Sequence, residues 1–224
     1  MSMLADALID WGWVGDHLDD IRFRLVQHIE LTVVAVGIGL AISLPLAVLS
    51  YRRRRFYGPI TAVTGILYTI PSLALFALLV PYTGLTSTTA EIGLVSYTLL
   101  ILIRNIVVGL RGVPEDVKEA ARGMGYTPSQ LLWRVELPLA MPAIVAGLRI
   151  ATVTTVGLVT VTSVLTEGGL GYFILNGFRR SFFSTMIFLG AGLSVMLAIT
   201  ADGVLLLVQR WLAPWARARQ ARSE

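Results

Sequence analysis

The chain contains no cysteine and only two histidines, His17 and His28. The absence of cysteine excludes disulfide bonds and thiolate metal sites, and it says little about the compartment. Two isolated histidines in a flanking segment are expected to be surface residues rather than metal ligands. Lys118 is the only lysine. A Walker A loop needs its lysine after a glycine, whereas Lys118 stands in Glu-Asp-Val-Lys-Glu, so the chain is not itself an ATPase.

Charge is also scarce. Only 14% of the 224 residues are charged, 55% are hydrophobic, and the mean hydropathy is +0.75. This composition is far more apolar than a soluble domain needs and indicates a membrane protein. The net charge of +4 comes from clustered basic residues, so we do not expect a nucleic-acid partner. The apolar segments carry no Ser/His pair or metal-ligand cluster, which argues against an enzyme.

Five long apolar segments alternate with polar ones, and a helix of about twenty residues crosses about 30 Å of hydrocarbon. We therefore expect an all-α integral membrane protein with transmembrane helices at 29–49, 59–80, 91–110, 139–164 and 182–209. Pro71 lies inside the second span and should kink it. The expected domains are an N-terminal segment 1–28, a transmembrane domain 29–209 and a basic tail 210–224.

The first 28 residues lack the basic start of a secretory signal and carry five aspartates: Asp6, Asp10, Asp16, Asp19 and Asp20. Trp11 and Trp13 suit a position at the level of the lipid headgroups. A short interfacial helix and a partly ordered tail are both compatible with this pattern.

Basic residues predict the orientation, because cytoplasmic loops are enriched in Lys and Arg. With the run 52–55 in the cytoplasm, twelve basic residues lie inside and four outside. The resulting topology has its N-terminus outside and its C-terminus in the cytoplasm. The inside set is Arg52, Arg53, Arg54, Arg55, Arg111, Lys118, Arg122, Arg134, Arg210, Arg217, Arg219 and Arg222.

The polar segment 111–138 separates the third and fourth spans. Pro114 is suited to the start of a helix, and two acidic residues then lie at the positive end of the helix dipole. The i, i+3, i+4, i+7 spacing predicts one apolar face with charged residues opposite. The apolar set is Val117, Ala120, Ala121 and Met124, and the charged set is Lys118, Glu119 and Arg122.

Gly123 and Gly125 should end this helix, because glycine enters the left-handed conformation at little cost. Thr127 to Gln130 reads as a capping box with proline at the first helical position. A second short helix through Leu131, Leu132 and Val135 is expected to end before Pro138. An amphipathic loop resting on lipid headgroups would fit the same pattern.

The sequence Glu119-Ala120-Ala121, with Gly125 six residues after the glutamate and then Val135-x-Leu137-Pro138, resembles the EAA loop of ABC-importer permeases. Val135 stands where isoleucine is common, a mild departure. The resemblance implies a type I ABC importer permease fold in which this coupling loop docks in a cleft of a cytoplasmic ABC ATPase.

Further motifs between residues 30 and 209 resemble the osmoprotectant branch of these permeases, which imports glycine betaine, choline, carnitine or proline. This implies a bacterial cytoplasmic-membrane location, an extracytoplasmic solute-binding protein, and ATP and Mg²⁺ in the partner ATPase, with no cofactor in this chain. Five helices are too few to enclose a path, so a second permease chain, identical or homologous, is expected. The motifs are Tyr68-Thr69-Ile70-Pro71-Ser72-Leu73-Ala74-Leu75, Arg104-Asn105, Gly109-Leu110-Arg111-Gly112-Val113, Ala146-Gly147-Leu148-Arg149-Ile150-Ala151-Thr152 and Gly168-Gly169-Leu170-Gly171.

Three other functions stay open at this point. The chain would also fit a permease for another small solute, such as an amino acid. A non-transport membrane protein, such as a channel subunit or an assembly factor, would not need an ATPase-docking loop. The third alternative is an enzyme.

Two further sets of residues are candidates for the transport path. Glu167, Gly168, Gly169 and Gly171 lie after the fourth span and are expected to form an outer gate or re-entrant turn. The fourth span is rich in threonine, and Thr155 and Thr162 are candidates for lining the path. Threonines that bond back to their own helix are the alternative.

Asp202 lies within the fifth span, where a charge is costly and requires a partner. Arg104 lies at nearly the same depth in the third span and is the first candidate for an ion pair. Arg149, somewhat deeper in the fourth span, is the second. The alternative is an unpaired Asp202 facing a watery vestibule, with the arginines extending to the headgroups.

Overall fold

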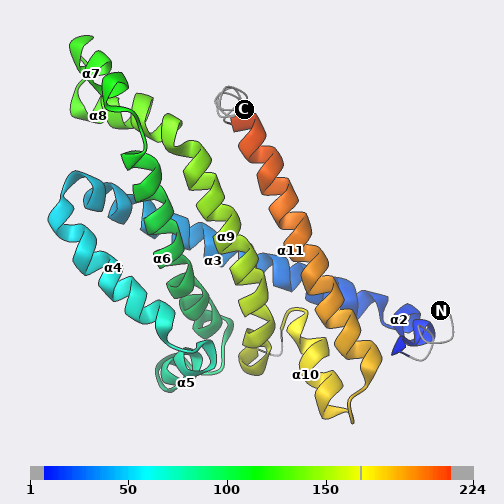
Figure 1. Cartoon of the computed structure of the whole chain (residues 1–224). Helices are drawn as coiled ribbons and strands as arrows, with labels where there is room; N and C mark the ends of the chain where they lie inside the picture. The colour runs from blue at the N-terminus through cyan, green and yellow to red at the C-terminus, as the bar shows by residue number, and fades with distance from the viewer. Residues whose placement is uncertain (1–7, 167, 213–224) are drawn as a thin grey trace.

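The computed structural model describes residues 8–166 and 168–212, and the described residues form a bundle of helices (Figure 1). Four helices are long and apolar enough to cross a membrane, and a bent pair makes a fifth span if its halves are counted together. The elements are α2 (Trp11–Asp16), α3 (Leu18–Arg52), α4 (Arg54–Thr69), α5 (Ser72–Thr83), α6 (Ser87–Arg111), α7 (Glu115–Gly123), α8 (Pro128–Leu131), the π-helical segment η1 (Leu132–Glu136), α9 (Leu137–Thr166), α10 (Gly171–Arg179) and α11 (Ser184–Leu212).

The first long helix begins earlier than hydropathy predicts. α3 contains 35 residues and starts at Leu18, so it crosses the expected boundary at residue 28 without a break. The reason is packing: Ile21 is buried against Leu170, Phe173 and Met186, which belong to α10 and its surroundings. The short helix α2 precedes α3 and is capped by the Asp10 side chain. Hydropathy detected only the part of α3 that is apolar on every side.

The second span is broken rather than kinked. α4 and α5 meet at an angle of 97°, and the break lies at Ile70 and Pro71, both in extended conformation. Pro71 has no N–H to continue the helix, and the residue before a proline avoids the α-helical region. The hydroxyl of Tyr97 on α6 donates to the Ile70 carbonyl, which satisfies one of the acceptors freed by the break.

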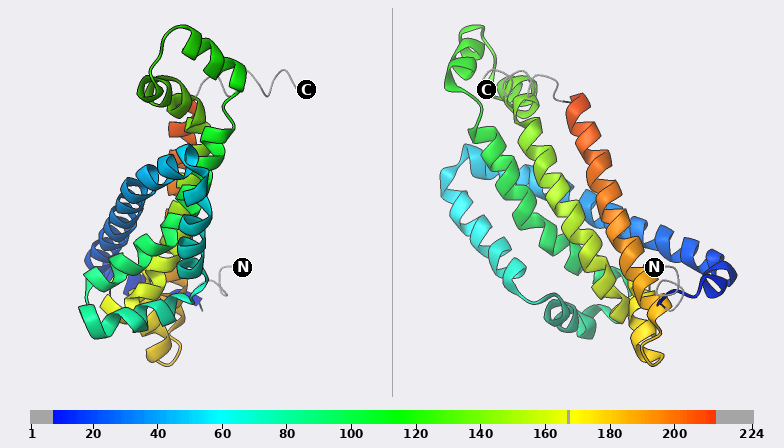
Figure 2. Two further views of the ribbon diagram at one scale, coloured as in Figure 1. Left: turned by 90° about the vertical axis from the view of Figure 1, so that its left-hand side faces the viewer. Right: turned by 45° about the vertical axis from the view of Figure 1, so that its right-hand side comes forward.

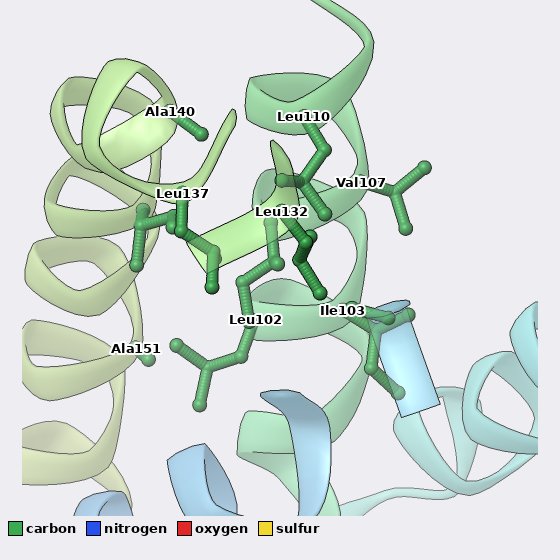
Figure 3. Packing of buried hydrophobic residues seen from close by; sticks show 11 residues of the cluster. Leu102, Ile103, Val107, Leu110, Leu132, Leu137, Ala140 and Ala151 are labelled. Atoms are coloured by element: carbon green, nitrogen blue, oxygen red, sulfur yellow. The ribbon is translucent and has the colours of Figure 1, made fainter. Parts of the chain in front are cut away.

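The main apolar core lies between α6 and α9 (Figure 3). Leucine and isoleucine side chains of α6 meet Leu137, Ala140 and Ala151 of α9, and Leu132 of η1 belongs to the same cluster. α9 lies between α6 and α11, and α3 crosses behind them (Figure 1). The α6 members of the core are Leu102, Ile103, Ile106, Val107 and Leu110.

The helix after the polar loop does not end before Pro138, contrary to the prediction. α8, η1 and α9 form one continuous helical stretch from Pro128 to Thr166. A proline inside a helix clashes with the carbonyl four residues before it, and the wider π turn immediately precedes Pro138. The polar loop is therefore built directly onto the fourth span.

The two ends of the bundle carry different structures. α7 and α8 project from one end, where the last described turn of α11 also lies, and α5 and α10 lie at the opposite end (Figures 1 and 2). The two candidate regions of the sequence, the polar loop and the glycine turn, are thus at opposite ends of α9.

Candidate functional site

The joint between α7 and α8 has the geometry that its glycine predicts. Gly125 has φ of +83°. Its N–H bonds to the Arg122 carbonyl, and the N–H of Tyr126 bonds to the Ala121 carbonyl, the pair of bonds that defines a Schellman motif. Gly123 is the last residue of α7 and lies outside the left-handed region, so Gly125 alone makes the turn.

The capping box that starts α8 is also present. The Thr127 hydroxyl accepts from the Gln130 N–H at 3.3 Å, and the Gln130 side chain accepts from the Thr127 N–H at 2.9 Å. Pro128 occupies the first turn. At the start of α7, Pro114 is the N-cap residue and Glu115 is the first helical residue.

The predicted apolar face of α7 is wrong in part. Ala121 is buried, but Ala120 is exposed and the Met124 side chain is 72% exposed. Lys118, expected to point outward, is 6% exposed. The reason is that the lysine side chain reaches Tyr51 near the end of α3; its ammonium lies 5.8 Å from the centre of the Tyr51 ring.

A polar network holds α7 against the bundle. The Lys118 ammonium lies 3.2 Å from Glu115, which also accepts from Arg122 at 2.9 Å. The Tyr51 hydroxyl donates to Glu136 at 2.6 Å. These contacts link α3, α7 and η1, so the loop is held at both of its ends.

The network shifts the pKa values of two groups. The hydrogen bond from Arg122, and after it the one from Lys118, lowers the pKa of Glu115 below its ordinary value. Burial alone would lower the pKa of Lys118, but its hydrogen bonds to Tyr51 and Glu115 outweigh burial and raise it. Both groups are therefore charged at neutral pH.

The seven residues of the EAA-like pattern are divided between surface and interior. Glu119, Ala120 and Gly125 are exposed. Ala121 and Leu137 are buried, at 2% and 8% exposure, and Val135 and Pro138 are partly buried. The exposed members, like Met124, are accessible to a partner, and the buried members pack into the chain.

The glycine turn after α9 is held by two neighbouring residues of α3. The Gly169 N–H donates to the Gln27 side chain at 3.0 Å, and the Leu170 N–H donates to Nδ1 of His28 at 3.2 Å. Gly169 has φ of +66°. A side chain at Gly171 would meet the Thr160 carbonyl oxygen at 2.0 Å, so α10 starts in direct contact with the α9 backbone. Glu167, the remaining gate candidate, lies outside the described residues.

The expectation that His28 is a surface residue is wrong. His28 is fully buried, and its Nε2 lies 3.0 Å from the Val156 carbonyl of α9. Because Nδ1 accepts a hydrogen bond, Nε2 carries the proton and donates, a tautomer assigned from the partners. The only signal available in the sequence was a lone histidine at the start of the first apolar segment. His17 is half-buried, and its ring stacks on Trp13 at 4.0 Å.

Asp202 forms an ion pair with Arg149, the second candidate, and not with Arg104. The guanidinium donates two hydrogen bonds of 2.8 Å to the carboxylate, from Nε to Oδ1 and from Nη2 to Oδ2. Gln209 adds a third contact to Arg149 at 3.5 Å and bonds to the Pro142 carbonyl. Within residues 8–166 and 168–212, Arg104 is exposed and forms no salt bridge. Its helix α6 lies on the far side of α9 from α11 (Figure 1).

The threonines of the fourth span follow the back-bonding alternative. Thr155 is 1% exposed and donates to the Ala151 carbonyl at 2.8 Å. Thr162 is fully buried and donates to the Val159 carbonyl at 2.8 Å. Neither hydroxyl lines an open path in this structure, so the prediction that they do so is not supported.

Comparisons with known proteins follow this geometry. Residues 35–218 match a family model described as "Binding-protein-dependent transport system inner membrane component". The chain is 34% identical to the "Choline transport system permease protein OpuBB" of Bacillus subtilis (strain 168), with 87% of this chain and 89% of the relative covered. It is 35% identical to the "Carnitine transport permease protein OpuCB" of Listeria monocytogenes, with 97% and 98% covered. It is 37% identical to the "Osmoprotectant import permease protein OsmW" of Salmonella typhimurium, with 84% and 89% covered.

Two solved structures have the same arrangement of helices. A MetNI methionine ABC transporter described as inward facing matches with a TM-score of 0.75 at 26% identity, covering 83% of this chain and 93% of that chain. An amino acid ABC transporter with histidines matches with a TM-score of 0.72 at 19% identity, covering 90% and 98%. The second likeness shows the fold alone.

Proposed function

Because the chain belongs to the family of binding-protein-dependent transport system inner membrane components, we propose that it is the transmembrane subunit of an importer for a small osmoprotectant. A member of this family is a multi-pass permease subunit of the cytoplasmic membrane and not a catalytic enzyme. Transport proceeds by alternating access, a two-state rearrangement of the spans. The observation that supports this proposal best is the α7–α8 loop. Its residues Glu119, Ala120 and Gly125 are exposed, and α8 is continuous with the fourth span.

The exposed surface of this loop is the proposed contact with a cytoplasmic ABC ATPase, which would hold the ATP and Mg²⁺. Glu119, Ala120 and Met124 are exposed, whereas Lys118 is buried against Tyr51 of α3 on the other side of the helix. Small and flexible side chains at such a surface permit close approach of another protein. We propose that the loop lies in the cytoplasm, with the N-terminus outside and the C-terminus inside, because most of the basic residues would then lie on the cytoplasmic side.

A second permease chain is proposed because α11 leaves much of its apolar surface uncovered. Only 6% of its most apolar window is buried, compared with 56% for α6. Two such chains would enclose the solute path, and a solute-binding protein would deliver the solute from outside. The exposed apolar residues of α11 include Phe188, Val195, Met196, Ile199, Val204 and Leu207.

The solute class is drawn from the relatives, whose names give choline, carnitine and osmoprotectants. Amino acids are the second candidate, because the structural neighbour at 26% identity is a methionine transporter. The test is uptake of labelled glycine betaine, choline, carnitine, proline and methionine by cells that express the complete importer and lack other uptake systems. Uptake of a quaternary amine with no uptake of methionine supports the proposal, and the reverse result refutes the solute class.

A further inference from the structure

A groove runs along one face of α3 toward the end that carries the arginine run. Its volume is about 640 Å³. One wall is formed by residues of α3 that recur every three to four positions, first apolar and then basic. The other wall is formed by α8 and η1. The lining residues are Leu44, Pro45, Val48, Leu49, Arg52, Arg53, Ser129, Leu132 and Trp133.

The order of these residues matches the order of groups in a phospholipid. Leu44, Val48 and Leu49 offer an apolar wall, and Arg52 and Arg53 follow at one end. From Leu44 to Arg53 the helix rises about 13 Å, close to half of the roughly 30 Å hydrocarbon core. A groove of this length spans one leaflet, with its guanidinium groups at the level of the phosphates.

The charges at the end of the groove are available to an anion. Arg53 forms no salt bridge within the described residues. Arg52 uses one guanidinium nitrogen to donate to the Pro128 carbonyl at 3.1 Å, which orients the side chain and leaves its other donors. Arginine binds phosphate through such a planar fork of donors. Clusters of arginine next to a membrane helix attract anionic lipids.

Trp133 completes the opposite wall. It is 60% exposed, and tryptophan is enriched where hydrocarbon meets headgroups. Behind it Leu132 is buried and closes the groove toward the core. The groove is therefore apolar along its length and cationic at one end only.

We propose that this groove binds one anionic phospholipid, with an acyl chain along Leu44, Val48 and Leu49 and its phosphate at Arg52 and Arg53. The site depends only on the chain lying in a membrane, so it is independent of the transported solute. Because the headgroup also lies beside Pro128, at the start of α8, an occupied groove would brace the base of the α7–α8 loop against α3.

The test uses the quenching of Trp133 fluorescence by brominated lipids, taken as the difference between the wild-type protein and Trp133→Phe. The purified importer is placed in vesicles in which the fraction of brominated phosphatidylglycerol, or of brominated phosphatidylcholine, is raised in steps. We expect Trp133 quenching to saturate at a lower fraction of phosphatidylglycerol. The double variant Arg52→Gln, Arg53→Gln should weaken the preference for phosphatidylglycerol over phosphatidylcholine about 25-fold. Each arginine near an anionic surface contributes about fivefold, and the two factors multiply.

Arg54→Gln with Arg55→Gln is the matched control, because it removes the same charge from the same run without touching the groove. Arg53→Gln alone covers the case in which loss of Arg52 disturbs α8. Val48→Phe, which narrows the groove at unchanged charge and adds no tryptophan, should abolish the quenching preference. Equal losses in the two double variants would overturn the site and leave a general attraction of basic residues for anionic lipid.

Occupation by another protein chain is the other outcome that would overturn the proposal. A cysteine at Val48 that crosslinks to a partner chain in the assembled importer, together with no phosphatidylglycerol preference at Trp133, would assign the groove to a protein interface.

Discussion

Replacing His28 by phenylalanine should destabilise the protein by removing a link between α3, α9 and the turn before α10. The ring joins α3 to the α9 backbone at Val156 and to the turn at Leu170, with hydrogen-bond distances of 3.0 and 3.2 Å. Phenylalanine keeps the ring and the packing but offers neither bond. Leu170 is fully buried, so its N–H loses its partner in a place that water does not reach.

The magnitude follows from the two bonds. A buried donor left without a partner costs about 1 to 3 kcal/mol, and the second bond adds about 1 kcal/mol. We therefore expect His28→Phe to lower the free energy of unfolding by about 2 to 4 kcal/mol. The measurement is unfolding in mixed micelles titrated with a denaturing detergent. Amide exchange at Leu170 should be slow in the wild-type protein and faster in the variant.

His17→Phe is the matched control. His17 is half-buried, and its ring nitrogen bonds to the Trp13 carbonyl four residues before it. A change of this kind near the surface costs less than about 1 kcal/mol. If the two variants lose the same stability, or if Leu170 exchanges at its wild-type rate in His28→Phe, the histidine does not hold the turn.

Three further outcomes are expected. Gly125→Val should reduce uptake while the chain still reaches the membrane, because a residue with φ of +83° is strained by any side chain. Gly123→Ala has open space around its position and should transport normally. Equal uptake by the two variants would contradict this prediction. Gly171→Ala should lower the thermal stability in detergent, because its Cβ would lie 2.0 Å from the Thr160 carbonyl oxygen. The Cβ of Gly157→Ala meets no atom, so this variant should keep the wild-type thermal stability. Wild-type thermal stability in Gly171→Ala would contradict the direct contact between the two backbones. Asp202→Ala should lower the thermal stability, and Arg149→Leu in the same chain should partly restore it. Arg104→Leu combined with Asp202→Ala should instead change the stability by the sum of the two single effects. If the losses of Asp202→Ala and Arg149→Leu also simply add, the two residues are not a coupled pair.

Local features of the sequence predicted local structure well. The turn at Gly125 and the capping box at Thr127 depend on bonds between residues at most five positions apart. The side-chain rules for such short distances hold whatever the rest of the chain does. The span at 91–110 was likewise predicted from its own hydropathy and corresponds to α6.

Features that depend on neighbours in space were missed. Lys118 and Tyr51 meet across two elements, and the Tyr51 to Glu136 bond joins residues 85 positions apart. Depth in the membrane favoured Arg104 as the partner of Asp202, but two residues at the same depth can lie on helices that are not neighbours. The partner is decided by which helix lies beside α11, and that helix is α9.

The stretch from Pro128 to Thr166 is a single mechanical piece of 39 residues, about 58 Å long at 1.5 Å per residue. No loop interrupts it, so an axial push or a torque applied at the α7–α8 end reaches the glycine turn at the other. Its only irregular winding is the π turn at Leu132–Glu136. Rewinding those five residues as α-helix would rotate one end against the other by about 100°, the twist of one residue. The π turn is therefore the place where a twist of the α7–α8 loop can change which side chains of α9 face the neighbouring helices.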